Sequence, residues 1–265
     1  MCIAYLALGV HRDWPVLIAA NRDEFHARPT RAAAPWPQQP EIIAGCDIRA
    51  GGTWLGVRRD GRYALVTNYR DPGAGLLPAA PSRGALVSDF LTGDLSAGAY
   101  IRQVHASAAA YNGFNLIVGD TAGAYYLGNR DPAGQAHALG AGRYVLSNHL
   151  LDTPWPKSQR LRAALDALDP NGLELSLAPV FEILRDGTPA EDHALPRTGI
   201  PLERERLLSS PFIVSPDYGT RCSTVVAMRA DGHCILSETS YDPQGTAIER
   251  HDWPYRRTAQ DSNHR

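Results

Sequence analysis

Cys2 is the first residue of this sequence whose side chain and position could together support nucleophilic chemistry. It follows Met1 and opens an apolar run. Once Met1 is removed, the residue carries a thiol and an α-amine, whose ordinary pKa of about 7.7 to 8.0 suits a base near neutral pH. This pairing is the N-terminal form of an activated nucleophile and needs no separate histidine. The alternative is that Cys2 is a small buried apolar residue.

A second group of polar residues, the tetrapeptide NRDE at 21–24, directly follows the apolar run at 16–20. If the two runs form a hairpin, this tetrapeptide returns beside Cys2. Asp23 could then hold or orient the α-amine, and Arg22 could lower the pKa of the thiol. The alternative is a solvated turn with an internal salt bridge.

The hydrophobic pattern predicts an α+β fold that positions these residues. Apolar runs flanking turn signals predict four β-hairpins, at 3–8 with 16–20, 54–59 with 63–69, 114–118 with 124–127, and 224–228 with 234–238. Apolar residues at three and four spacing predict helices at 82–92, 97–110, 157–168 and 175–184. This order does not alternate as a βαβ repeat does, so antiparallel sheets covered by helices are expected. The proline-rich stretches 35–40 and 72–81 are predicted to be loops.

Composition and charge restrict the class of protein. The 265 residues are 44% hydrophobic and 20% charged, which is typical of a folded globule. We expect one domain over 1–255 and a polar C-terminal tail over 256–265. The formal charge of -2 argues against a nucleic-acid partner. No apolar run reaches the roughly 18 to 20 residues of a membrane span. The N-terminus does not resemble a secretory signal, so a cytoplasmic protein is predicted.

The cysteines and histidines do not indicate a metal site. The four cysteines, at positions 2, 46, 222 and 234, are widely spaced and form no CxxC pair. The nine histidines include no HExxH motif or closely spaced pair. We therefore predict no metal and no cofactor.

Taken together, the motifs resemble those of the NRDE-motif family related to Transport and Golgi organisation protein 2. The resemblance spans residues 1 to about 240 and rests on Met1-Cys2, NRDE at 21–24, GGTWLG at 51–56, LVTNYR at 65–70, LSN at 146–148 and GTR at 219–221. That family in turn resembles N-terminal nucleophile (Ntn) hydrolases of the penicillin V acylase and bile salt hydrolase type. The resemblance implies a four-layer αββα sandwich with two antiparallel sheets.

The resemblance also implies catalytic roles for five residues. Cys2 falls on the acylase nucleophile and Asp23 on an aspartate near the end of the second strand. Asn68 resembles the oxyanion-hole position, Asn148 the second active-site asparagine, and Arg221 a distal arginine. An amide NH2 group can donate to a developing oxyanion. The alternatives are turn or cap roles for the asparagines and a structural salt bridge for the arginine.

Four further residues are expected to bind substrate or support the site, namely Asn21, Arg22, Glu24 and Trp54. The acylases carry an arginine directly before the asparagine of the second strand, where this sequence has Ala20. Arg22 stands one residue after Asn21. Whether Arg22 replaces that guanidinium is left open by the sequence.

The implied function is that of an N-terminal cysteine hydrolase or acyltransferase. It would act through a thioester on a small amide or acyl substrate, and as an amidohydrolase it would cleave C–N bonds other than peptide bonds. The expected partner is this small molecule, and a homo-oligomer is compatible with the sequence. The alternative is a non-catalytic binding or trafficking protein for haem or lipid on the same scaffold, since a fold does not determine function. A haem carrier would need an axial ligand facing a large apolar pocket.

Overall fold

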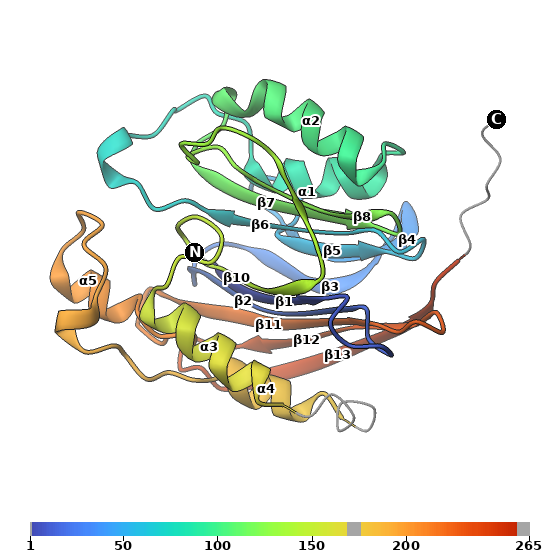
Figure 1. Cartoon of the computed structure of the whole chain (residues 1–265). Helices are drawn as coiled ribbons and strands as arrows, with labels where there is room; N and C mark the ends of the chain where they lie inside the picture. Colours follow the sequence, from blue (N-terminus) through green and yellow to red (C-terminus); the bar gives the residue numbers. More distant parts are fainter. Residues whose placement is uncertain (1, 169–175, 259–265) are drawn as a thin grey trace.

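The computed structural model describes residues 2–168 and 176–258, which form two antiparallel β-sheets covered on their outer faces by helices (Figure 1). The first sheet has the order β10 (Gly142–Leu146), β1 (Cys2–Leu8), β2 (Val16–Phe25), β11 (Tyr218–Met228), β12 (His233–Tyr241) and β13 (Ala247–Arg256). The second has the order β3 (Thr30–Trp36), β4 (Gln39–Asp47), β5 (Leu55–Arg58), β6 (Tyr63–Asn68), β7 (Phe114–Asp120), β8 (Gly123–Gly128) and β9 (His137–Leu139).

The helices lie in two outer layers, so the layers follow the order αββα. The second sheet is covered by α1 (Arg83–Thr92) and α2 (Ala97–Ser107), and the first by α3 (Pro156–Asp166) and α4 (Ala178–Leu184), while α5 (Leu202–Leu207) lies beside the end of the first sheet (Figure 1). Short 3-10 turns occupy Pro72–Ala74, Ala108–Ala110 and Asp192–Ala194. The expected four-layer α+β sandwich is therefore the observed architecture.

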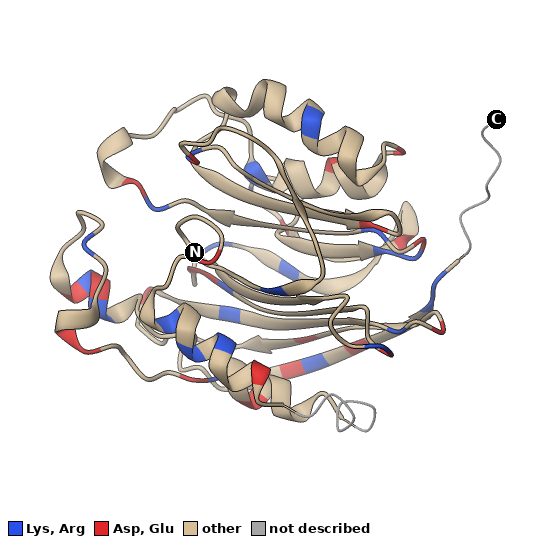
Figure 2. Cartoon of the chain, viewed as in Figure 1, with Lys and Arg blue, Asp and Glu red and all other residues tan. Residues whose placement is uncertain are grey.

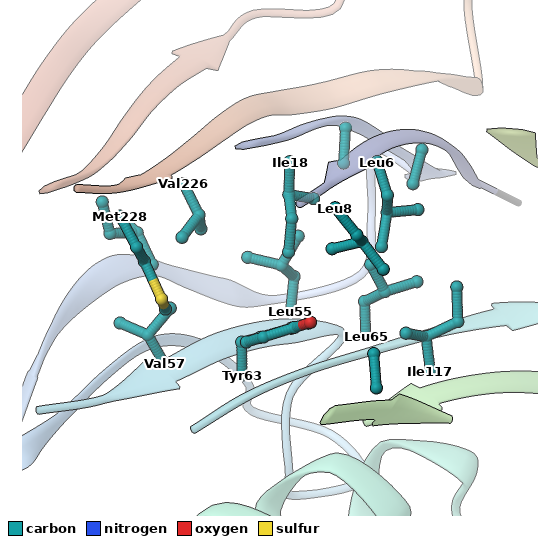
Figure 3. Packing of buried hydrophobic residues seen from close by; sticks show 14 of the residues in the cluster. Leu6, Leu8, Ile18, Leu55, Val57, Tyr63, Leu65, Ile117, Val226 and Met228 are labelled. Atoms are coloured by element: carbon teal, nitrogen blue, oxygen red, sulfur yellow. The ribbon is translucent and has the colours of Figure 1, made fainter. Parts of the chain in front are cut away.

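Alternation along the strands separates the core into three layers. In β1, Leu6 and Leu8 pack between the sheets, whereas Tyr5 faces the helices. The inter-sheet layer brings these leucines against Leu55 and Leu65 of the other sheet (Figure 3). Because successive side chains of a strand point to opposite faces, a strand buried on both faces reads as a continuous apolar run. This explains why the residues that follow Cys2 in β1 form a continuous apolar run.

The four predicted hairpins are confirmed as β1–β2, β5–β6, β7–β8 and β11–β12. The four predicted helices are found as α1 to α4, with ends that differ by a few residues. Residues 169–175, which include the predicted start of α4, lie outside the described part of the chain.

The prediction of a loop at 35–40 is wrong, because these residues belong to the β3–β4 hairpin. Pro35 lies in β3, the edge strand of its sheet, at a register shift between Pro35 and Trp36. An edge strand tolerates proline, since the missing N–H need not serve a neighbour. Strands β9, β10 and β13 also have no counterpart in the sequence prediction.

The predicted tail begins inside the fold. Arg256 ends β13, and the backbone N–H of Arg257 donates to the carbonyl of Gly232. Residues 259–265 lie outside the described part of the chain.

Basic and acidic positions are interspersed along β13 and α5 (Figure 2). None of the described helices has the length and apolar character needed to cross a membrane.

A buried carboxyl group joins the two sheets at one edge. Glu238 of β12 accepts hydrogen bonds from the backbone N–H of Ala33 (2.7 Å) and from the Thr224 hydroxyl (2.8 Å). The indole N–H of Trp253 donates to the Ala33 carbonyl (2.7 Å). Both backbone groups of Ala33, in the irregular part of β3, are thus satisfied by the opposite sheet.

We expect Glu238→Ala to lower the free energy of unfolding by about 1–3 kcal/mol, because it leaves the Ala33 N–H buried without an acceptor. Burial raises the pKa of the Glu238 carboxyl, so the neutral variant Glu238→Gln should lose less. The control is Glu249→Ala, since Glu249 is exposed and its ion pair with His251 is at the surface. Urea unfolding measures all three. Equal losses for Glu238→Ala and Glu249→Ala would contradict this role.

Candidate functional site

A cavity of about 370 Å³ lies where β1 begins and where β2 and β6 end, and its lining includes the candidate nucleophile. Its lining includes Cys2, Asp23, Asn68 and Trp54. The loop between β4 and β5 and the first turn of α1 close the other side. Three of the five predicted catalytic residues therefore share one cavity.

The β1–β2 hairpin places Cys2 opposite Arg22, so both side chains point to the same face of the sheet. Burial raises the pKa of the Cys2 thiol, the Asp23 carboxylate also raises it, and the Arg22 guanidinium lowers it. Arg22 thus acts in the expected direction, but the net shift is upward because desolvation of the thiolate dominates. A base beside the sulfur would therefore be needed for attack near neutral pH.

Asp23 is buried at the base of the cavity, with 2% of its surface exposed. It lies opposite Thr220 of β11, whose hydroxyl donates to Asp23 Oδ1 at 2.7 Å. Burial raises the pKa of the Asp23 carboxyl, while Lys157, this hydrogen bond and Arg22 lower it. The net shift is upward, because desolvation of the carboxylate outweighs the groups that favour its charged form.

Asn148 joins the end of β10 to the end of β6. Its Nδ2 donates to the carbonyl of Asn68 at 3.1 Å, and its own carbonyl accepts from the N–H of Arg70 at 2.7 Å. The neighbouring Ser147 hydroxyl donates to the Cys2 carbonyl at 3.4 Å. Residues far apart in the sequence are thus tied to one another at the start of β1.

The Asn68 side chain lines the cavity. Among residues 2–168 and 176–258, none forms a hydrogen bond with its amide group. Its NH2 group can therefore donate to a molecule bound beside Cys2.

The charged residues of the NRDE tetrapeptide form one wall of the cavity. The Arg22 guanidinium lies 4.3 Å from the centre of the Trp54 ring and 3.7 Å from Asp47 Oδ2. Glu24 lies 3.8 Å from the Nε of Arg28, which also contacts Asp47 at 2.7 Å. The predicted salt bridge within the tetrapeptide exists as a long Arg22–Glu24 contact of 3.9 Å. Arg22 itself is buried rather than solvated.

Two predicted residues point away from this cavity. Asn21 donates to the carbonyls of Leu184 and Pro211, which fixes the end of α4 against the sheet. The Arg221 guanidinium donates to the carbonyls of Phe25 and His26. In the described structure, both side chains hold backbone segments, and neither lines the cavity.

Two residues of the site were missed by the sequence analysis. Lys157 is completely buried in the first turn of α3, and its Nζ donates to Asn148 Oδ1 at 3.4 Å. The sequence contains a signal for it, since Lys157 is the single lysine among 26 basic residues. Arg83, at the start of α1, lines the cavity and donates to the carbonyl of Gly113 at 3.0 Å. No sequence pattern distinguishes Arg83 from the other arginines.

The described residues contain no group of three or more His, Cys, Asp or Glu side chains placed to hold a metal ion. The chemistry available at this site is that of a thiol, three carboxylates, amides and cations. These groups suit attack on a carbonyl carbon followed by stabilisation of an oxyanion.

Two solved structures show partial similarity to this fold. One is the Caenorhabditis elegans orthologue of N-acylethanolamine-hydrolyzing acid amidase, with a TM-score of 0.44, 14% identity, and coverage of 84% of this chain and 92% of that chain. The other is a mutant of conjugated bile acid hydrolase from Clostridium perfringens, with a TM-score of 0.43, 11% identity, and coverage of 99% of both chains.

Sequence comparison gives a closer relationship. The chain is 38% identical to the Transport and Golgi organization protein 2 homolog of Bos taurus and 36% identical to that of Homo sapiens. Both matches cover 91% of this chain and 93% of the relative. The family model for Transport and Golgi organisation 2 matches residues 1–243. This chain therefore belongs to the Transport and Golgi organisation 2 family.

Proposed function

We propose that this protein is an N-terminal cysteine hydrolase or acyltransferase that acts on a small amide or acyl substrate through a thioester. The observation that carries the proposal is the shared cavity of Cys2, Asp23 and Asn68, with Asn148 bonded to the backbone of Asn68. The proposal requires removal of Met1, which exposes the α-amine of Cys2.

The proposed reaction has two stages. The thiol gives its proton to the α-amine, and Sγ attacks the carbonyl carbon of the substrate. The oxyanion accepts a hydrogen bond from Asn68 Nδ2. Collapse of the intermediate breaks the C–N bond, and the ammonium returns the proton to the leaving amine. Water then attacks the thioester, releasing a carboxylic acid and restoring the thiol. In a transferase, an amine or alcohol replaces this water.

A panel of N-acyl amides and thioesters tests the proposal directly. Protein whose Met1 has been removed, as verified by mass spectrometry, should turn over at least one member, while Cys2→Ala should not. Trapping with a slow substrate should add the acyl mass to the peptide that contains Cys2. A processed protein that forms no acyl adduct with any member would count against the reaction.

Reactivity of the thiol gives a test that needs no substrate. In the processed protein, Cys2 should alkylate with iodoacetamide near neutral pH faster than the other three cysteines, because it lines the cavity and has a base attached. Cys222 and Cys234 are buried, which raises the pKa of both thiols. Cys46 is partly exposed and provides the internal reference. Peptide mass spectrometry measures the four rates. Labelling of Cys2 no faster than Cys46 would contradict an activated nucleophile.

The border of the cavity favours lipid binding as a second candidate function. Four of the large exposed apolar side chains, Phe25, Ile48, Leu76 and Leu77, belong to segments that border the cavity. Exposed apolar side chains in segments that line a charged cavity suit an amphiphilic ligand. For haem, Cys2 is the one lining residue of a usual axial type among the described residues. Lipid binding that survives Cys2→Ala in a protein without acyl transfer would favour this second function.

A further inference from the structure

Lys157 is buried next to the candidate site, in a position where a positive charge needs compensation by other groups. It follows Pro156, which occupies the first turn of α3, and 1% of its surface is exposed. Burial of an ammonium group is unfavourable unless other groups compensate its charge. All other basic residues of the chain are arginines. The surroundings of Lys157 should therefore show what its charge does.

The charged and titratable groups around Lys157 come from four other segments. They are Cys2 of β1, Asp23 of β2, Arg70 after β6, and Glu205 of α5. Burial and Arg70 lower the pKa of Lys157, whereas Asp23, Cys2 and Glu205 raise it, and the net value is about 8. Lys157 thus changes charge close to physiological pH.

Of the two carboxylates, Asp23 is the one that compensates Lys157. Glu205 is occupied by Arg70, whose Nη1 lies 2.7 Å from Glu205 Oε2. Its other oxygen accepts from the backbone N–H and the hydroxyl of Thr198. Arg70 and Glu205 therefore form a neutral buried pair. The positive charge of Lys157 lowers the pKa of the Asp23 carboxyl, in addition to the larger effect of the amino terminus and the smaller effect of Arg22.

Lys157 also determines which end of the Asn148 amide faces Asn68. Asn148 Oδ1 accepts from Lys157 Nζ, and this leaves Nδ2 directed at the Asn68 carbonyl. A rotated amide would direct its NH2 group at the ammonium and its oxygen at a carbonyl, so both contacts would become repulsive. A protonated Lys157 therefore holds a single orientation.

We propose that Lys157 is a positioning residue whose ammonium group orients Asn148 and helps to balance the Asp23 carboxylate, so that the site is held in a single arrangement while Lys157 is protonated. The link between these three residues is independent of what the protein does. The catalytic consequence rests on the proposed function. Acyl transfer should then decline as the pH rises through about 8.

Because the chain has a single lysine, biosynthetic incorporation of ¹³Cε-lysine gives one NMR signal for the titration. In the wild-type protein, its midpoint should lie near pH 8. In Asp23→Asn the midpoint should fall by about one unit or more, because a stabilising negative charge is lost. The matched control is Asp47→Asn, since Asp47 lines the same cavity but pairs with Arg28. A midpoint near the ordinary value of about 10.4, or equal shifts in both variants, would overturn the proposal.

Two variants test the consequence for turnover. Lys157→Met should be destabilised, because it leaves the buried Asp23 carboxylate without this balancing charge, so its turnover is measured at a temperature where the variant is folded. It should lose about 10²-fold in turnover, as for an oxyanion donor that is no longer held in place. Lys157→Gln keeps a donor toward Asn148 and should recover part of the rate, without the decline near pH 8. Lys157→Met with wild-type turnover and pH profile would overturn the positioning role.

The two proposals fail in different ways. Full turnover by processed Cys2→Ser would contradict the proposed function, but the NMR coupling between Lys157 and Asp23 would be unaffected. If Cys2 is essential for turnover but the titration midpoint of Lys157 is unchanged in Asp23→Asn, only the positioning role is contradicted. If neither Lys157 variant folds, the NMR titrations of wild type, Asp23→Asn and Asp47→Asn still test the link between Lys157 and Asp23.

Discussion

Cys2→Ser should abolish acyl transfer in the processed protein and change the free energy of unfolding by less than about 1 kcal/mol. The rate falls because a hydroxyl has a far higher pKa than a thiol, so the weakly basic α-amine generates much less nucleophile. Stability is preserved because residue 2 is at the end of β1 and its side chain borders a cavity. Substrate binding should survive, since the serine side chain has nearly the same shape.

The matched control for Cys2→Ser is Cys46→Ser. Cys46 has intermediate exposure like Cys2, lies in β4 and does not line the cavity. It should retain turnover on the same substrate. Steady-state kinetics and urea unfolding of both variants separate chemistry from folding. A folded, processed Cys2→Ser protein with full turnover would refute the mechanism and favour the binding function.

Asn148→Ala should reduce both rate and stability. We expect a loss of about 10²- to 10³-fold in turnover, the scale of a missing oxyanion donor, because the end of β6 that carries Asn68 loses its support. The free energy of unfolding should fall by about 1–3 kcal/mol, because Lys157 and the Asn68 carbonyl lose a buried partner. If Asn148 only stabilised its own turn, the variant would lose stability but not turnover.

Asn115→Ala provides the matched control. Asn115 is also fully buried and bonds to Thr67, His149 and Tyr126, but it does not line the cavity. Its loss of stability should be similar and its loss of turnover smaller. Kinetics at a temperature where both variants are fully folded provide the comparison. Equal kinetic losses would mean that Asn148 acts through folding alone.

Local patterns were sufficient for the parts of the fold that neighbouring residues decide. The Asp60-Gly61 turn and the apolar runs on either side predicted β5 and β6. The two apolar runs at the N-terminus predicted the β1–β2 hairpin, and hairpin pairing alone brings Cys2 beside Arg22. Turn chemistry and side-chain alternation act over a few residues, which is why the sequence by itself determined these contacts.

Only the tertiary structure decided the contacts between distant segments. Asn148 reaches Asn68 across 80 residues, and Lys157 reaches Asn148 from a different layer of the fold. Asn21 and Asp23 have the same alternation, yet Asn21 meets the end of α4 while Asp23 borders the cavity. What a side chain contacts depends on which element packs over it. That choice is made by burial of the three core layers together, a cooperative property that no short stretch of sequence contains.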